Sequence, residues 1–408
     1  MLFADIIAQQ NTKQHLLEMV EQNRLSHALL FLGKEGCGAL PLALAFAEYV
    51  SLLPNAPSTG GRREEASLFG ETIEEAKPIF PKTAEEADAF MQKQPGFSKA
   101  NNYIHPDIHF SYPVIPKKSG DKPVSTDYIS EWREFIQQYP YGNVYDWLQS
   151  IGAENKQGNI TAEECNDIIH KLNLKSFESS HKILVMWMPE YLGKEGNKLL
   201  KLIEEPPADT LFILVAENED LILPTILSRC QLIKINALET AEITEALIKR
   251  SNTEPAKAVQ TAAIAQGNYR EALQLLQNAS EDQQSLLREW LNAILKNGPP
   301  AQVKWIEEIS KLGREKQKQF LLYFIHLLQQ SIRIRFAGNN PVSVADSEKD
   351  FAGRLNKFAP INHQQAIIEE LNKAVYYIER NANAKMLFHT LTIKLYHLIK
   401  NNALILTG

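Results

Sequence analysis

The sequence predicts an α/β domain with a parallel sheet, followed by a region made only of helices. Three observations lead to this fold class. Apolar runs of strand length alternate with helical stretches up to about residue 236, as in sheets whose parallel strands are joined by helices. A glycine-rich turn joins the first of these strands to a helix. After residue 236 strand patterns vanish from the sequence and amphipathic helices follow, including the strongly apolar segment 320–328.

Four continuous apolar runs are expected to be strands of this sheet, since strands buried on both faces lack polar alternation. They are residues 28–32, 182–188, 211–216 and 232–235. Residues 108–114 alternate as a shorter strand would. Helices are expected after the glycine turn, from the capping box Thr161–Glu164 to Leu172, and from Tyr191 to Glu205, where two prolines stop the helix.

The expected organisation has three parts, which are an α/β domain over about 1–236, a small helical domain over about 237–281 and a larger helical domain over about 282–408. Domains of about 100–200 residues are usual, so the chain is long enough for two or three. A loop is expected at 58–63. The segment from about 115 to 158 is expected to be an insertion, with many aromatic residues between 126 and 150.

Composition and charge argue against several function classes. The net charge of −6 provides no global basic field for nucleic acid, so any DNA contact must be local or belong to an assembly. The first residues lack a signal-peptide pattern, and the most apolar stretch, 40–53, is too short to span a membrane. Three scattered cysteines form no CxxC pair. A cytoplasmic protein without a membrane segment is therefore expected.

The stretch from Gly33 to Leu40 is similar to a phosphate-binding loop from which the reactive side chains are missing. Two glycines of the pattern G-x-x-x-x-G-K-S/T are present, as Gly33 and Gly38. Ala39 replaces the lysine that would reach the β- and γ-phosphates, and Leu40 replaces the hydroxyl residue that would hold Mg²⁺. The pattern indicates a nucleotide-binding fold retained for a purpose other than hydrolysis. An ordinary strand, turn and helix is the alternative.

Six segments, in order along the chain, resemble the bacterial clamp-loader subunits of the AAA+ superfamily. They are RLSHALLF at 24–31, HPD at 105–107, NKLLKLIEEPP at 197–207, PTILSRCQ at 224–231, GNYREAL at 267–273 and RNANAK at 380–385. The insertion at about 115–158 has no counterpart in the resemblance. The resemblance implies an AAA+ domain, a helical lid at 237–281, and a helical collar at 282–408 through which subunits assemble.

Within this family the residues favour a subunit that does not hydrolyse ATP. An active motor subunit of the gamma/tau type carries an Asp–Glu pair where this chain has Trp187 and Met188, and neither side chain is a ligand for Mg²⁺. Glu190 lies beyond the strand end. The clamp-opening delta subunit generally lacks the arginine of the SRC segment, which is Arg229 here. The resemblance therefore implies the non-hydrolysing stator of the DNA polymerase III clamp loader, without a bound cofactor.

Arg229 is the residue expected to carry the function. By resemblance, its guanidinium enters the ATP site of a neighbouring subunit and acts there as an arginine finger in trans, a role suited to its permanent charge and forked donors. The alternative is a surface arginine that closes a turn. Arg270 matches the family's lid arginine and is expected to pair with Glu190 or a backbone carbonyl, or to contact residual nucleotide. The amides of Gly36 to Ala39 are expected to hold an anion weakly at most.

Three lysines in the NKLLKLIEEPP region recur at spacings of four and three, so a helix would place them on one face. They are Lys194, Lys198 and Lys201. A solvated face is one interpretation, and salt-sensitive contact with DNA phosphates is the other. The side expected to be buried consists of Leu199, Leu200, Leu202 and Ile203.

No zinc is expected, although the family usually carries closely spaced cysteines ahead of the HPD segment. Met91, Gln94 and Phe97 keep a three-residue rhythm there, but none supplies a thiolate. Apolar packing by Phe90, Met91 and Phe97 is expected instead. The alternative is a metal site formed by His105, Asp107 and His109, but no fourth ligand lies nearby in sequence.

The implied partners are gamma/tau motor subunits and the delta subunit, in a hetero-pentamer that acts on the sliding clamp and primer-template DNA. The chain itself would have no polymerase or ATPase activity, and DNA-directed DNA polymerase activity would belong to the holoenzyme. Two alternatives remain open. One is a working AAA+ ATPase of the gamma/tau type in which Lys34 replaces the missing lysine, and the other is a DNA-binding AAA+ adaptor outside replication.

Overall fold

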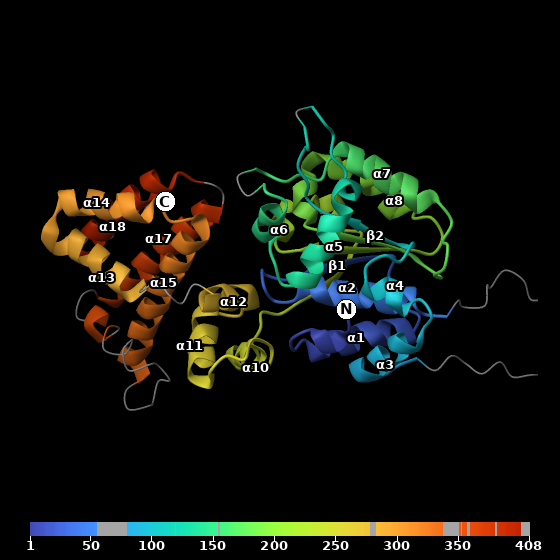
Figure 1. The fold of residues 1–408 in the computed structure, drawn as a ribbon, viewed down its shortest axis with the longest axis horizontal. Coiled ribbons are helices and arrows are strands. Elements are labelled where there is room, and N and C mark those ends of the chain that lie inside the picture. Colours follow the sequence, from blue (N-terminus) through green and yellow to red (C-terminus); the bar gives the residue numbers. More distant parts are fainter. Residues whose placement is uncertain are drawn as a thin grey trace, which may run out of the picture. The chain divides into compact units, whose positions relative to one another are not determined.

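The computed structural model describes residues 1–54, 80–118, 120–153, 156–277, 283–337, 351, 353–356, 360–379 and 382–400. The chain forms two compact units (Figure 1). The first contains Met1–Glu242 and Gly267–Arg270, and the second contains Ile243–Gln266 and Glu271–Gly408. The three-part division into AAA+ domain, lid and collar stays a prediction. The loop expected at 58–63 and residues 380 and 381 of the RNANAK segment lie outside the described residues.

The first unit is built on a five-stranded sheet with the strand order β2-β3-β4-β1-β5, and all its pairings are parallel. The strands are β1 (Ala28–Leu32), β2 (Ile108–Ser111), β3 (Lys182–Trp187), β4 (Thr210–Ala216) and β5 (Gln231–Lys234). Each lies where an apolar run or an alternating segment predicts it. The predicted α/β domain with a parallel sheet, followed by a region of helices, is confirmed.

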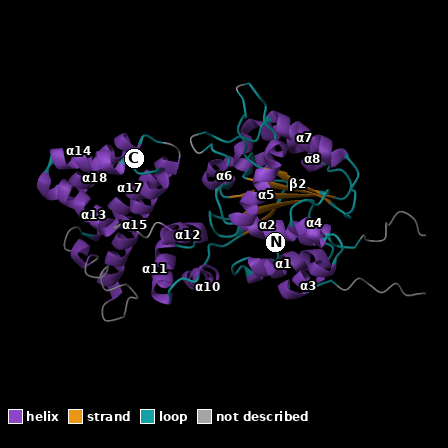
Figure 2. Ribbon diagram, in the orientation of Figure 1, coloured by secondary structure: helices purple, strands orange, loops and turns teal. Residues whose placement is uncertain are grey.

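Side chains of alternate strand residues enter two separate cores, because successive residues of a strand point to opposite faces. Leu29, Phe31 and Val185 pack on the face that also holds α2 (Ala39–Ser51). Leu30 and Met186 belong to the opposite core, with α7 (Ala162–Asn173). Figure 2 shows the strands in orange between the helices of these two layers. The sheet is therefore covered on both faces, as its nearly continuous apolar strands require.

The remaining elements of the first unit are mostly short helices. They are η1 (Phe3–Asp5), α1 (Gln10–Glu21), α3 (Ala84–Lys93), α4 (Phe97–Asn101), η2 (Ser125–Tyr128), α5 (Ile129–Gln138), α6 (Val144–Ser150), η3 (Pro189–Leu199), α8 (Leu200–Glu204), η4 (Glu219–Leu221) and α9 (Pro224–Leu227).

The aromatic insertion is a packed part of the first unit. Trp132 on α5 is fully buried, stacks on Tyr112 with ring centroids 4.1 Å apart and meets Trp147 of α6 edge-on at 5.4 Å.

The carboxylate of Glu164 accepts hydrogen bonds of 2.6 Å from the amide and the hydroxyl of Ser125. The predicted capping box is therefore only half formed. Thr161 Oγ1 accepts from the Glu164 amide at 3.1 Å, but the Glu164 side chain holds the insertion instead.

The helical stretch predicted from Tyr191 to Glu205 is present, but it is not one continuous α-helix. The segment forms a 3₁₀-helical stretch, η3, and then the short α8. Gly193 interrupts η3 with φ 50° and ψ −132°, a conformation open to glycine and unfavourable for other residues. The glycine therefore divides the lysine-bearing segment into parts with different geometry.

The described part of the second unit is helical, as the sequence predicts after residue 236. Its elements are α10 (Thr240–Ser251), α11 (Pro255–Ala265), α12 (Tyr269–Gln277), α13 (Gln283–Asn292), the π-helical η5 (Ala293–Asn297), α14 (Pro299–Ile309), α15 (Arg314–Ala337), α17 (Ile361–Glu379) and α18 (Ala384–Lys400), of which α10 and α12 begin in the first unit. The apolar segment 320–328 lies in α15 and is largely buried within this unit, in agreement with the burial in a bundle or at a subunit interface that its apolar character predicts. Trp290 stacks on Trp305 at 4.7 Å in the same core. No helix in the described ranges has the length and apolar character needed to cross a membrane.

Candidate functional site

The glycine loop has the predicted local form of strand, turn and helix. β1 ends at Leu32, and α2 begins at Ala39 with Gly38 as its N-cap. Gly36 and Gly38 have φ values of +70° and +95°, in the left-handed region that favours glycine. The turn therefore needs these two glycines for its backbone path.

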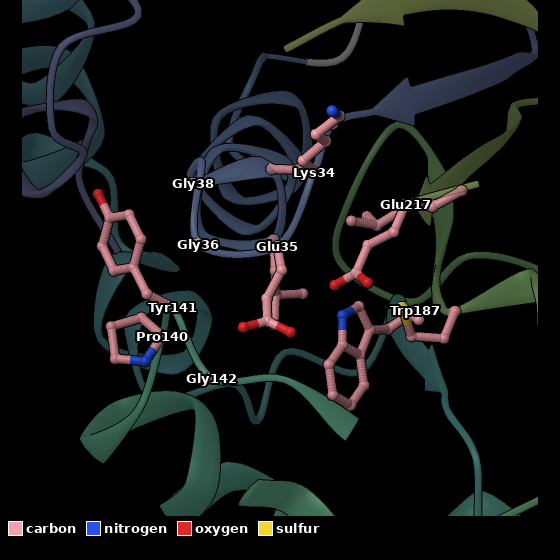
Figure 3. Close-up of a pocket in the computed structure, with 15 residues that line it drawn as sticks. Lys34, Glu35, Gly36, Gly38, Pro140, Tyr141, Gly142, Trp187 and Glu217 are labelled. Atoms are coloured by element: carbon pink, nitrogen blue, oxygen red, sulfur yellow. The ribbon is translucent and has the colours of Figure 1, made fainter. Parts of the chain in front are cut away.

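A pocket of about 320 Å³, open solvent included, lies against this loop (Figure 3). It is lined by the loop and the start of α2, by Pro140–Gly142 of the insertion, by Trp187 and Met188 after β3, and by residues 215–217 at the end of β4. The enclosed part of this space is about 30 Å³, enough for two or three water molecules.

The four positions at which nucleotide ligands are missing carry buried apolar side chains. Ala39, Leu40, Trp187 and Met188 are each at most 9% exposed. Lys34 is exposed, and Figure 3 shows its side chain pointing away from Glu35 and Trp187. None of these five side chains brings a charge or a metal ligand into the pocket.

Glu190 serves to connect two strand ends. Its Oε1 accepts hydrogen bonds from the amides of Glu217 at 2.7 Å and Asn218 at 2.9 Å, directly after β4. Burial raises the pKa of Glu190, and these amides partly oppose the rise. The carboxylate therefore holds the backbone beside the pocket.

Arg270 is almost completely buried and pairs with two carboxylates, so the expected pairing with Glu190 or a carbonyl is corrected. Its Nη2 donates to Asp146 Oδ1 at 2.7 Å, its Nε also bonds Asp146, and its Nη1 lies 3.2 Å from Glu35 Oε1. Glu35 additionally accepts from Asn143 and Asn268, each at 2.9 Å. A buried guanidinium needs such partners, because an unpaired charge is costly away from water.

Tyr141 of the insertion lies between the glycine loop and residue 269. Its hydroxyl accepts a hydrogen bond of 2.8 Å from the Ile7 amide, and its ring meets Tyr269 edge-on at 5.0 Å. A Cβ placed on Gly38 would lie 3.1 Å from the Tyr141 ring. The insertion therefore reaches the loop with the Tyr141 ring as well as with the side-chain amide of Asn143, which donates to Glu35.

Sequence reasoning missed the roles of Glu35 within the glycine loop and of the side chains that gather beside it, which are Tyr141, Asn143, Asp146 and Asn268. The one available signal was the sequence NVYD at 143–146, where Asn143 and Asp146 form a reciprocal capping box at the start of α6. That signal locates a helix start but not its place beside the glycine loop.

We predict that Gly36→Ala destabilises the first unit by about 2–4 kcal/mol, from left-handed backbone strain plus overpacking. A Cβ at Gly36 would lie 1.9 Å from Asn268 Oδ1. Gly152→Ala is the matched control, since Gly152 has φ +67° but no heavy atom within 4 Å of its Cβ position. Backbone strain alone should cost about 1–2 kcal/mol there. Urea unfolding of both variants tests this, and equal losses would mean that Asn268 moves aside freely.

Arg229 lies on the surface of the first unit, just after α9. Its Nη1 donates to the Thr225 carbonyl at 2.6 Å and to Ser228 Oγ at 3.1 Å, and its Nη2 pairs with Glu204. Its side chain is 34% exposed. Surface ion pairs are worth about 0–1 kcal/mol, so a phosphate group can compete for the guanidinium. The neighbouring Cys230 has a pKa raised to about 11 by burial, which disfavours a reactive thiolate.

The three lysines are all exposed, but they do not lie on one continuous α-helix. Lys194 and Lys198 belong to η3, and Lys201 belongs to α8. Lys198 pairs with Glu195 at 3.3 Å. The buried side is as predicted, since Leu199, Leu202 and Ile203 are buried and Leu200 packs partly against the same core. DNA contact by these lysines stays a prediction.

Asp107 of the HPD segment holds the backbone of residues 177–179. Both oxygens of Asp107 accept amide hydrogen bonds of 2.6–2.7 Å, from Phe177, Glu178 and Ser179. His105 Nδ1 accepts from the Asp107 amide at 3.2 Å. Within the described part of the chain no three His, Cys, Asp or Glu side chains are grouped as metal ligands. The absence of zinc stays a prediction.

The apolar packing expected ahead of this segment is confirmed. Met91 is fully buried in the core that contains α2, and Phe90 and Phe97 pack against that core. The segment is therefore held by side-chain burial.

Residues 76–239 match the protein family described as DNA polymerase III, delta subunit. The chain is 25% identical over 264 residues to DNA polymerase III subunit delta' of Bacillus subtilis, covering 64% of this chain and 57% of the relative. It is 24% identical over 274 residues to subunit delta' of Haemophilus influenzae, covering 66% and 80%. With subunit gamma of Buchnera aphidicola it shares 30% identity over 144 residues, covering 34% and 39%.

Among solved structures, a DNA polymerase III gamma subunit-related protein of Thermotoga maritima is similar with a TM-score of 0.37 and 14% identity, covering 94% of this chain and 99% of that one. The matches span 57% of the Bacillus relative and 39% of the Buchnera relative. Three of the segments described above, at 105–107, 197–207 and 224–231, lie within the matched residues 76–239. Residues 76–239 thus carry the domain described as DNA polymerase III, delta subunit, and the relatives of the chain, at low identity, are named DNA polymerase III subunits delta' and gamma.

Proposed function

We propose that this chain is a delta-prime-type stator, a clamp-loader subunit that does not hydrolyse ATP. It supplies Arg229 in trans to the ATP site of a neighbouring motor subunit while the sliding clamp is loaded onto primer-template DNA. The family match and the named relatives support a role in DNA replication. The partners in this proposal are gamma/tau motor subunits and a delta subunit.

The observation that carries the proposal is the joint replacement of the lysine, the hydroxyl and the acidic pair at one pocket. Ala39 and Leu40 stand where lysine and hydroxyl are needed, and Trp187 and Met188 stand where acids are needed. All four side chains are buried. Phosphoryl transfer depends on positioned cations and Mg²⁺ to stabilise the transferring phosphate. A pocket walled by these apolar groups lacks that stabilisation.

The position of Arg229 supports the second half of the proposal. The guanidinium is on the surface, beside α9, and its ion pair with Glu204 is exposed to solvent. Arginine fingers act by stabilising the charge that develops in the transition state at a neighbouring subunit's site. This role needs only a permanently charged guanidinium that the neighbouring site can contact. A chain with an inactive pocket of its own still has such a group to offer.

The test is ATP turnover by the purified chain, alone and after mixing with gamma/tau and delta subunits. We expect no turnover above background for the chain alone, and a stable complex with DNA-stimulated turnover after mixing. Turnover by the chain alone that disappears in Lys34→Ala would establish the working-ATPase alternative. Failure to capture gamma/tau and delta would favour an adaptor outside replication.

A further inference from the structure

We propose that the insertion takes the place of a nucleotide in this chain. Tyr141 fills space beside the glycine loop, and Asp146 together with Glu35 supplies the negative charge that Arg270 requires. This inference deepens the proposed function, because it explains how the inactive pocket is kept closed without a ligand.

The charge balance is the first argument. Arg270 is 3% exposed, so its guanidinium must be neutralised inside the protein. Asp146 receives two of its donors, Nε and Nη2, and Glu35 lies within 3.2 Å of Nη1. A triphosphate approaching Arg270 would meet two carboxylates already in place. Like charges at short range repel strongly where water is scarce, so the pair opposes nucleotide entry.

The position of the aromatic ring is the second argument. Tyr141 lines the pocket and contacts the Ile7 amide and the Tyr269 ring, and its own ring lies 3.1 Å from the position that a Cβ on Gly38 would take. Figure 3 shows Tyr141 and Glu35 on the pocket side of the glycine loop. The space that remains is small, so the ring occupies volume that a bound ligand would otherwise fill.

The glycine loop itself is the third argument. The Gly36 carbonyl accepts a hydrogen bond of 3.1 Å from the Tyr269 amide, and the missing Cβ of Gly36 leaves room for Asn268. The glycines that give phosphate close access to the backbone elsewhere give Asn268 and Tyr141 close access here. The loop therefore binds parts of its own chain.

The anchoring of the insertion is the fourth argument. Trp132 contacts Trp187 with ring centroids 5.2 Å apart, and Phe135 contacts the same ring at 5.9 Å. Trp187 is one of the residues that replace the acidic pair. The substitution that removes a metal ligand thus provides the surface on which the insertion packs.

Hydrogen exchange of the purified full-length chain tests the proposal. In Asp146→Asn, the amides of residues 268–270 and 36–39 should exchange at least about tenfold faster, because a buried ion pair is lost. Glu134→Gln, at an exposed carboxylate of the same insertion, is the matched control and should change neither segment. Tyr141→Phe keeps the ring but removes the acceptor, so the Ile7 amide should exchange faster.

Adding MgATP or MgADP to the wild-type chain should leave exchange at residues 33–40 unchanged. Protection of this segment by nucleotide would overturn the proposal, as would unchanged exchange at 268–270 in Asp146→Asn. Neither of these exchange results would test the role of Arg229, because the arginine finger is tested by ATP turnover in the partner subunit. A wrong finger assignment would likewise leave these exchange results intact.

Discussion

Replacing Arg229 with alanine is expected to slow hydrolysis at the adjoining motor site by about 10³-fold, the lower end of the effect of arginine fingers. The guanidinium would stabilise charge that develops on the transferring phosphate, and alanine has no donor to do so. In the chain itself the substitution breaks contacts with Thr225, Ser228 and Glu204 on the surface, so folding should be little affected.

The measurement is single-turnover ATP hydrolysis and clamp loading by a reconstituted complex on primer-template DNA. Arg229→Lys keeps the charge but loses the fork, so it should recover only part of the rate. Glu204→Gln is the matched control, because it removes the partner of Arg229 within the chain and leaves the finger intact. Unchanged turnover in Arg229→Ala, with the complex still assembled, would rule out the finger assignment.

Trp132→Ala is expected to lower the free energy of unfolding of the first unit by about 3–5 kcal/mol, as large-to-small aromatic changes in cores do. Trp132 is fully buried among Tyr112, Trp147 and Trp187, so its removal leaves a cavity between the insertion and β3. Equilibrium unfolding in urea, followed by circular dichroism, gives the change.

Two variants make this measurement specific. Trp132→Phe should cost less, about 1–2 kcal/mol, because the ring is retained in part. Its Nε1 also has no acceptor among the described residues, so no hydrogen bond is lost. Tyr139→Ala, at a half-exposed aromatic residue of the same insertion, should stay within about 1 kcal/mol. A loss below this level in Trp132→Ala would mean that the insertion is not packed on β3.

The sequence alone was sufficient for the sheet, the glycine turn and the replacement of the expected nucleotide ligands by apolar residues. Apolar runs such as 28–32 indicate buried strands because burial on both faces leaves no polar alternation. Gly33 and Gly38 mark the turn, and Ala39 and Leu40 show that two nucleotide ligands are missing. These features are local, since each depends on residue types a few positions apart.

Other features depended on contacts between distant segments. The break at Gly193 was missed because a helix pattern tolerates one glycine, and the surrounding packing decided its backbone conformation. Only half of the capping box at Thr161 forms, because the Glu164 side chain accepts a hydrogen bond from the buried Ser125, 39 positions away, instead. In both cases tertiary contacts outweighed a local preference of about 1 kcal/mol.

The sequence by itself determined that the lysine, the hydroxyl and the acidic pair expected of an active subunit are absent at residues 39, 40, 187 and 188, since a missing side chain is visible without any structure. Only the tertiary structure decided what replaces them. Arg270 and Asp146 are 124 positions apart, and no periodicity connects them. They meet because burying a guanidinium requires a carboxylate nearby, and the folded insertion brings that carboxylate to it.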